Sequence, residues 1–199
     1  MQEREFMLVI SCHSDTGFIS HSLTKLENNV FHGHLDNFSG VYSVMKAYFS
    51  GRLCQDYIHI EFTWGEETDM EGAYELLKHL EKDDLVLVVD VTGTPTQKDF
   101  VIEKCKNSIL KEFLYQSLEG MSFDLYEDCP DPVSIYDEVD VYSTDCPYVC
   151  FLGIPCTGGD YNEGKVFCTE QSLESLSQAL CRIAENYPSF CKKLRLKIS

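Results

Sequence analysis

The stretch Leu85–Val89, with the sequence LVLVV, is the clearest signal for a fold in this chain. An unbroken apolar run of this length, bounded by polar residues, is typical of a strand buried on both faces of a parallel sheet. Two similar runs occur at Phe6–Cys12 (FMLVISC) and Tyr148–Ile154 (YVCFLGI). The segment Tyr57–Thr63 instead alternates, which predicts a strand with one apolar and one polar face. These segments together predict a sheet with a buried centre.

Helical segments alternate with these strands. Apolar residues recur at helical spacing in Asp36–Phe49, Asp69–Glu81, Asn107–Leu118 and Ser172–Tyr187. In the first helix the aligned residues are Phe38, Val41, Tyr42, Met45 and Phe49. Strands alternating with helices predict an α/β three-layer sandwich, with a mixed, mostly parallel sheet flanked by helices.

The remaining segments carry weaker patterns. Short strands are expected at Asp99–Cys105 and Ser122–Tyr126, whereas Glu127–Asp145 is acidic and is expected to be irregular. A loop is expected over Gly158–Gly164, after the strand that Pro155 ends.

The charge balance excludes several classes of partner. The chain has 33 acidic and 16 basic residues, a net charge of −17. Phosphate backbones and anionic membranes attract basic surfaces, so we expect no nucleic-acid partner and no membrane association. No apolar stretch approaches the roughly 18 residues that a membrane span needs.

Ten cysteines are present in the 199 residues. An even number allows a disulfide framework, but the charged N-terminal residues MQERE are not followed by the apolar core of a secretion signal. A chain of this length also has enough apolar residues to fold without cross-links. We therefore expect a cytoplasmic protein with mostly reduced and buried cysteines.

Polar side chains gather at the predicted carboxyl ends of the strands. His13 and Asp15 follow the first strand, Glu66 and Glu67 follow the alternating strand, and Asp90 follows LVLVV. In open α/β sheets, ligands bind beyond these strand ends. Imidazole and carboxylate groups suit zinc, and also manganese, cobalt or nickel. A metal site is therefore predicted at this edge of the sheet.

Four short motifs occur in a recognisable order. They are His13-Ser14-Asp15, Asp36-Asn37-x-x-Gly40, Thr63-x-x-Glu66-Glu67-x-x-x-x-Gly72-Ala73, and Val89-Asp90-Val91-Thr92. This order resembles the di-zinc aminopeptidase and carboxypeptidase superfamily, which has the zinc-dependent exopeptidase fold. The resemblance covers residues 6–95 well and residues 145–187 loosely. It implies a single metallopeptidase-like catalytic domain over residues 1–199, with no lid or dimerisation insert.

The resemblance also implies a set of metal ligands. His13 and Asp90 would bind one metal, Asp36 would bridge two metals, and Glu67 would bind the second. The implied cofactor is zinc, as one or two ions, with manganese or cobalt as substitutes.

Two further residues receive catalytic roles from the resemblance. Glu66 would be the general base that takes a proton from the attacking water and passes it to the leaving amine. Asp15 would orient His13 by a hydrogen bond to its ring.

One ligand of the superfamily has no counterpart in this sequence. The superfamily supplies a last histidine after a strand that here ends in Gly153-Ile154-Pro155, but no histidine follows His79. Asn162, Cys168 or no residue at all could take that position, with Asp160 and Glu163 as further oxygen donors nearby. Loss of this ligand would leave the second metal weak or absent.

Simpler interpretations exist for several of these residues. Asp36 could act only as a helix cap, and Glu66 and Glu67 could be ordinary acids in the first turn of a helix. His32 and His34 flank Asp36 closely, but we interpret them as residues of an exposed loop. His13 could be a polar residue that follows a strand.

The sequence thus predicts a metal-dependent hydrolase that cleaves amide bonds of small peptides or acyl amino acids, in the manner of an aminopeptidase. The alternative is a catalytically impaired relative that acts as a binding or interaction module. A third possibility is a one-metal hydrolase that uses His13, Asp36 and Asp90. A structure that separates the histidine from the acids would exclude the hydrolases.

Overall fold

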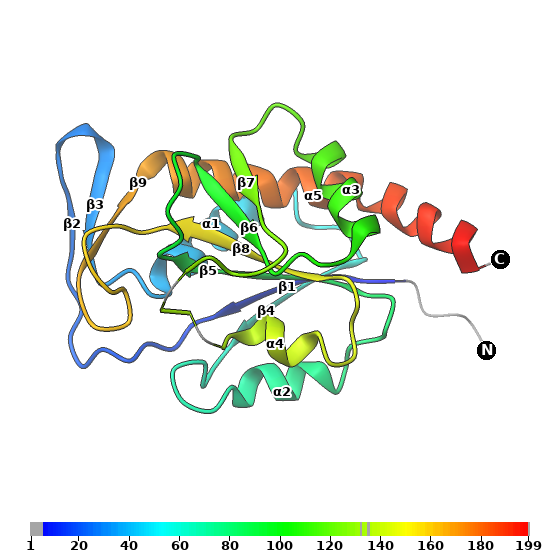
Figure 1. The fold of residues 1–199 in the computed structure, drawn as a ribbon, viewed down its shortest axis with the longest axis horizontal. Helices are drawn as coiled ribbons and strands as arrows, with labels where there is room; N and C mark the ends of the chain where they lie inside the picture. The colour runs from blue at the N-terminus through cyan, green and yellow to red at the C-terminus, as the bar shows by residue number, and fades with distance from the viewer. Residues whose placement is uncertain (1–5, 132, 135, 199) are drawn as a thin grey trace.

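A six-stranded sheet forms the centre of the computed structural model, which describes residues 6–131, 133–134 and 136–198 (Figure 1). Its strands lie in the order β4 (Ile58–Thr63), β1 (Leu8–His13), β5 (Leu85–Thr92), β8 (Val149–Pro155), β6 (Phe100–Glu103) and β7 (Phe123–Leu125). The first four strands in this order are parallel. Strand β6 is antiparallel to β8, and β7 is parallel to β6. All residues of β1 and β5 are buried.

Helices cover both faces of this sheet (Figure 1). One face carries α1 (Phe38–Phe49), α3 (Ser108–Ser117) and α5 (Glu170–Ile198), whose apolar residues form the larger core. The other face carries the short helices α2 (Glu71–Leu77) and α4 (Glu138–Tyr142), which form a smaller core. The predicted α/β three-layer architecture with a mixed, mostly parallel sheet is confirmed.

A second, three-stranded sheet lies beside the carboxyl ends of the central strands (Figure 1). It consists of β2 (Leu23–Lys25), β3 (Val30–Gly33) and β9 (Val166–Thr169), all antiparallel, with a short 3-10 helix η1 (Glu27–Asn29) before β3. This sheet was not predicted, because its strands are short and two of them lie in a polar stretch. It joins the region before α1 to the region before α5.

The aromatic face predicted for α1 is not the buried one. Phe38, Tyr42 and Phe49 are exposed, whereas the buried residues of α1 are Ser39, Gly40, Ser43, Val44 and Ala47. Small residues on this side let α1 approach α5 and the sheet closely, so packing distance rather than side-chain hydropathy decides which face is buried.

Three helices also differ from expectation. Helix α5 continues past Tyr187 and Pro188 to Ile198, because Phe190 and Leu194 extend its buried stripe. Helix α2 is shorter than predicted, and α4 lies within the stretch expected to be irregular.

Most cysteines are buried, with Cys54 exposed. No helix among the described residues is long and apolar enough to cross a membrane.

Candidate metal centre

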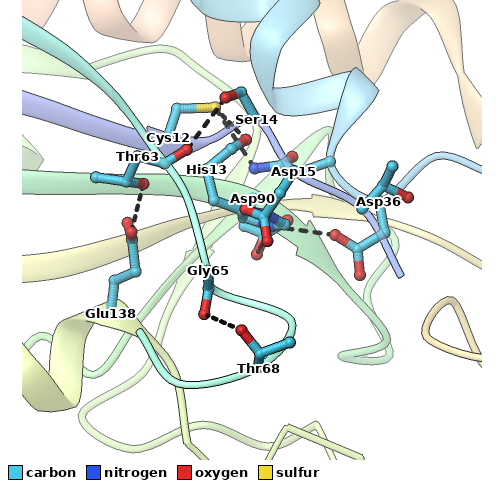
Figure 2. Close-up of polar contacts among 12 residues, drawn as sticks. Cys12, His13, Ser14, Asp15, Asp36, Thr63, Gly65, Thr68, Asp90 and Glu138 are labelled. Carbon is cyan, nitrogen blue, oxygen red and sulfur yellow. Dashed lines mark hydrogen bonds and ion pairs between the residues drawn. The ribbon is translucent and has the colours of Figure 1, made fainter. Parts of the chain in front are cut away.

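His13 ends β1, Asp90 lies two residues before the end of the neighbouring parallel strand β5, and their side chains meet at the edge of the sheet. The Nε2 atom of His13 lies 3.1 Å from Oδ2 of Asp90 and 3.2 Å from Oδ1 of Asp36. His13 and Asp36 are almost completely buried, and Asp90 is 7% exposed. Figure 2 shows the imidazole ring lying among the three predicted acids Asp15, Asp36 and Asp90. The sheet alone brings residues 13 and 90 together, since β1 and β5 are adjacent.

Asp36 is held in place by its neighbour Asn37. The Asn37 side chain caps α1 by accepting a hydrogen bond from the Gly40 backbone N–H (3.0 Å), and it donates one to the carbonyl of Val89 (2.8 Å). Val89 directly precedes Asp90, so Asn37 fixes the start of α1 beside the end of β5. A Cβ atom at Gly40 would lie 2.2 Å from Asn37 Oδ1, which explains the glycine in this motif.

Glu66 and Glu67 lie in the tight turn between β4 and α2. Gly65 adopts a left-handed conformation (φ +75°), and its carbonyl accepts from the backbone N–H groups of residues 68–70. A Cβ atom at Gly72 would lie 2.5 Å from the Trp64 backbone nitrogen, so the helix approaches the strand end closely. This turn directs both carboxylates back toward His13.

Asp15 connects His13 to the glutamate turn. Its Oδ1 lies 3.5 Å from Nδ1 of His13, and its carboxylate accepts a hydrogen bond from the Glu67 backbone N–H. Burial raises the pKa of Asp15, but the interactions with His13 outweigh it and lower the pKa below its ordinary value. Asp15 thus lies beside the Nδ1 atom of His13, and its orienting role stays a prediction.

Two groups of potential metal ligands occur among the residues that the structure describes. They are His13 with Asp36 and Asp90, and His13 with Glu66 and Glu67; within each group the ligand atoms all lie within 4.8 Å of one another. The buried atom Asp36 Oδ1, which faces Nε2 of His13, has no well-aligned hydrogen bond in the described part of the chain. Buried polar atoms of this kind are ordinarily satisfied, so the donor set fits a divalent cation.

The acids of the site repel one another electrostatically. Burial, together with Asp90, raises the pKa of Glu66 from 4.5 to about 9. Burial and the nearby Asp36 raise the pKa of Asp90 from 3.8 to about 7, although His13 opposes the shift. Burial lowers the pKa of His13, but Asp90, Asp15 and Asp36 outweigh it and raise the pKa well above its ordinary value. The cluster therefore favours bound positive charge, supplied by protons or by a metal.

A buried glutamate that sequence reasoning missed, Glu138, bonds to side chains of β1 and β4. Glu138 accepts hydrogen bonds from Thr63 (2.5 Å; Figure 2) and from Ser11 (2.8 Å), and Ser11 also bonds to Tyr142. Thr63 and Ser11 belong to β4 and β1, which carry the glutamate turn and His13. The signal was the capping box from Asp137 to Asp140 at the start of α4, within a stretch that otherwise looks irregular.

A small cavity of about 60 Å³ opens beside the cluster. It is lined by Asp36, Glu66 and Asp90 together with Val91, Val133, Ser134, Tyr136, Asp137, Phe151, Tyr161 and Asn162. The hydroxyl of Tyr161, also missed by sequence reasoning, donates to Asp131 Oδ2 (2.8 Å). A larger cavity of about 860 Å³ lies between β9 and residues 96–99; Cys168 lines it, whereas His13, Asp36, Glu67 and Asp90 do not.

Comparison with solved structures identifies the architecture. The chain superposes on an aminopeptidase from the archaeon Desulfurococcus kamchatkensis with a TM-score of 0.69 and 15% identity, covering 87% of this chain and 54% of that one. A TET aminopeptidase from a marine sediment thaumarchaeon gives 0.68 and 15%, covering 85% and 55%. An aminopeptidase from Thermotoga maritima gives 0.62 and 12%, covering 82% and 48%.

The chain shares the fold of these solved aminopeptidases. The resemblance predicted from the motifs is thereby confirmed at the level of the fold, and the chain spans about half the length of the solved aminopeptidases it matches. No protein-family profile matches the sequence, and no curated protein matches it significantly in sequence.

Within this exopeptidase fold, the two residues considered for the missing histidine lie in different surroundings. Asn162 lines the cavity beside Asp36 and Asp90. Cys168 is buried in the core, where it bonds to Ser39 and lies near Cys156. Cys168 belongs to neither group of potential ligands in the described ranges.

The structure corrects in part the interpretation of His32 and His34 as residues of an exposed loop. His32 lies in strand β3, stacked on Phe167 with ring centroids 4.3 Å apart, rather than in an exposed loop. His34 packs against Phe18, and its Nδ1 accepts from the Ser22 backbone N–H. Both are engaged by the small sheet and the loop before it.

Proposed function

We propose that this protein is a metal-dependent hydrolase that cleaves amide bonds of small peptides or acyl amino acids. The observation that carries the proposal is the convergence of His13 Nε2, Asp36 and Asp90 within 4.8 Å of one another at the strand ends. The exopeptidase fold adds support, since its solved representatives include aminopeptidases.

In this proposal His13, Asp36 and Asp90 hold one zinc ion, and Glu67 contributes to a second. When bound, zinc acts as a Lewis acid that polarises a carbonyl group and lowers the pKa of water. Manganese or cobalt would accept the same imidazole and carboxylate donors. Asp15 holds the His13 ring in the orientation that leaves Nε2 free for the metal.

Glu66 is the proposed general base. Its carboxylate lines the cavity beside Asp36 and Asp90, where an attacking water and a substrate carbonyl would meet. The pKa of about 9 applies to the cluster without a cation, and bound positive charge would lower it toward neutrality. Glu66 would then accept the proton of water and deliver it to the leaving amine.

The charge of the site favours substrates with a free amino group. Asp36, Glu66, Glu67 and Asp90 surround the site, and His13 is the basic residue in both groups of potential ligands among the described residues. An ammonium group at a peptide N-terminus would be attracted by such a site. This argues for aminopeptidase-like specificity.

Hydrolysis assays test the proposal directly. The chain, loaded with zinc, manganese or cobalt, would be incubated with a panel of amino-acid amides, dipeptides and acyl amino acids. We expect turnover that a chelator abolishes, and a loss of about 10²- to 10⁴-fold in kcat for Glu66→Gln at unchanged metal content. Metal binding without turnover on any substrate would favour the binding module, and failure to bind metal would exclude the hydrolase.

A further inference from the structure

Strand β4 forms an open edge of the central sheet. It is the first strand in the sheet order and pairs with β1, and no other strand of the described residues pairs with it. Its sequence IHIEFT places Ile58, Ile60 and Phe62 on one face and His59 and Glu61 on the other. The Nε2 atom of His59 lies 2.9 Å from Oε2 of Glu61, and both side chains are partly exposed.

This edge lacks most of the features that usually prevent strands from pairing with other chains. Protected edges carry charged residues, above all lysine, or proline, are very short, or are interrupted by a bulge, and of these features β4 has only the charged residue Glu61. Strand β4 has six residues, contains neither lysine nor proline, and keeps an unbroken register with β1. The strand is therefore able to accept another strand along Ile60–Phe62 and at the carbonyl of Ile58, whose N–H is already bonded to Gln55.

The peptide groups available for pairing can be assigned. The carbonyls of Tyr57 and Thr63 accept hydrogen bonds from Leu8 and Ser14, so odd-numbered residues direct their peptide groups toward β1. Peptide groups alternate in direction along a strand. Ile60 and Phe62 therefore direct theirs to the open side, and Ile58 directs its carbonyl there.

An apolar groove runs alongside this edge. A cavity of about 330 Å³ lies between α1 and β4, lined by Val44, Met45, Tyr48, Leu53, Ile58, Ile60 and Phe62. Tyr48 is half exposed, and the adjacent Phe49 is 73% exposed. The apolar surface thus continues from the edge strand onto the aromatic face of α1, where exposed apolar area of this kind favours association.

We propose that two copies of this chain associate through antiparallel pairing of their β4 strands, around a two-fold axis at Ile60. Side chains directly opposite each other in an antiparallel pair lie on the same face of the sheet. In this register Ile60 faces the partner's Ile60 and Ile58 faces the partner's Phe62 on the apolar side. On the other side His59 faces the partner's Glu61, and Glu61 faces the partner's His59.

The sequence of β4 is complementary to itself in an antiparallel pair, so a second copy of this chain fits the open edge. Moving the axis by one residue toward either end would place His59 opposite the partner's His59, or Glu61 opposite the partner's Glu61. Two opposed histidines lack the attraction between histidine and glutamate, and two opposed glutamates repel each other. The register centred on Ile60 also uses the outward peptide groups of Ile60 and Phe62. Both α1 helices would then lie on the same face, where each covers part of the apolar groove.

Sedimentation velocity of the full chain over a range of concentrations tests this dimer. We expect a concentration-dependent dimer that His59→Glu weakens by about tenfold or more, since each histidine–glutamate pair across the interface becomes a pair of glutamates that repel each other. The double variant His59→Glu with Glu61→His restores the pairing and should recover the dimer. His79→Glu, the same exchange at an exposed position outside β4, is the matched control and should leave the dimer unchanged.

Hydrogen exchange locates the interface independently. In the dimer the amides of Ile60 and Phe62 should become protected as concentration rises, whereas the exposed loop amides should not change. A chain that stays monomeric at high concentration would overturn the proposal. So would a dimer that persists in His59→Glu, or one in which the amides of Ile60 and Phe62 exchange as in the monomer.

Discussion

The imidazole of His13 contacts the carboxylate of Asp90 across two neighbouring strands, with 3.1 Å between Nε2 and Oδ2. This contact needs no loop to create it, because β1 and β5 are adjacent, parallel and buried along their length. Asp36 approaches the same nitrogen from the start of α1. The strands of the sheet and one helix end are thus sufficient to assemble a donor set that fits a metal ion.

Removal of the histidine should abolish tight metal binding. His13→Ala deletes the nitrogen that both groups of potential ligands share, so we expect zinc affinity to fall by more than about 100-fold. Asp15→Asn keeps the histidine but weakens its orientation, and should reduce affinity by about 10- to 100-fold. Competition against a chromophoric chelator measures both values. Equal affinity in His13→Ala and the wild-type chain would refute the assignment.

The stability of the metal-free protein should fall as pH rises. Glu66 and Asp90 have pKa values raised from 4.5 to about 9 and from 3.8 to about 7, so the folded state retains protons that the unfolded state has lost. The stabilisation they contribute is complete below about pH 4 and disappears as pH passes 7 and 9. Asp15 has a lowered pKa, so the stability that it contributes is present at neutral pH and is lost only as the pH falls through its pKa in the folded state.

Denaturant unfolding between pH 5 and 9, with and without zinc, measures this dependence. Glu66→Gln should make the decline shallower, because the glutamine does not titrate. Zinc should stabilise the protein more at higher pH, where its ligands are deprotonated. Stability that rises with pH in the metal-free chain would contradict the electrostatic description of the site.

Gly40 should not tolerate a side chain. Alanine there would place Cβ 2.2 Å from Asn37 Oδ1, displacing the side chain that connects α1 to Val89. We expect Gly40→Ala to lower the free energy of unfolding by about 1–3 kcal/mol and to weaken zinc binding, since Asp36 precedes Asn37. Gly164→Ala, whose Cβ meets nothing within 4 Å, is the control. Thermal unfolding and zinc titration of the two variants make the comparison.

Two substitutions of the buried residue Glu138, to Gln and to Leu, should change the stability of the fold in different ways. Burial raises its pKa, although Thr63 and Ser11 oppose the shift, so ionisation at high pH destabilises the fold. Glu138→Gln should therefore gain stability relative to wild type as pH rises. Glu138→Leu leaves the Thr63 hydroxyl without its acceptor and should cost about 1–3 kcal/mol at any pH. Equal pH profiles for wild type and Glu138→Gln would show that this carboxyl does not titrate.

The sequence predicted those parts of the fold whose local pattern agrees with their final environment. The buried runs at β1, β5 and β8 are strands, and the acids at their carboxyl ends converge because parallel strands end at a common edge. The start of α1 was predicted as well, since Asn37 and Gly40 act through local contacts.

The parts that sequence reasoning missed depend on contacts between distant segments. Strand β9 forms because residues 166–169 pair with β3, more than 130 residues earlier in the chain, and no local pattern indicates this. The aromatic residues of α1 misled the assignment of its buried face, because close packing against α5 selects serine, glycine and alanine. Glu138 and Tyr161 enter the site region only through side-chain contacts that cross the sheet end.

An anomalous difference map from a crystal of the zinc-loaded protein, collected at the zinc edge, tests the central claim most directly. We predict a peak within about 2.0–2.2 Å of His13 Nε2 and of carboxylate oxygens of Asp36 and Asp90. A second, weaker peak near Glu67 would indicate two metals. A map with no peak at these residues, or with zinc bound elsewhere in the chain, would contradict the assignment of a metal centre to these strand ends.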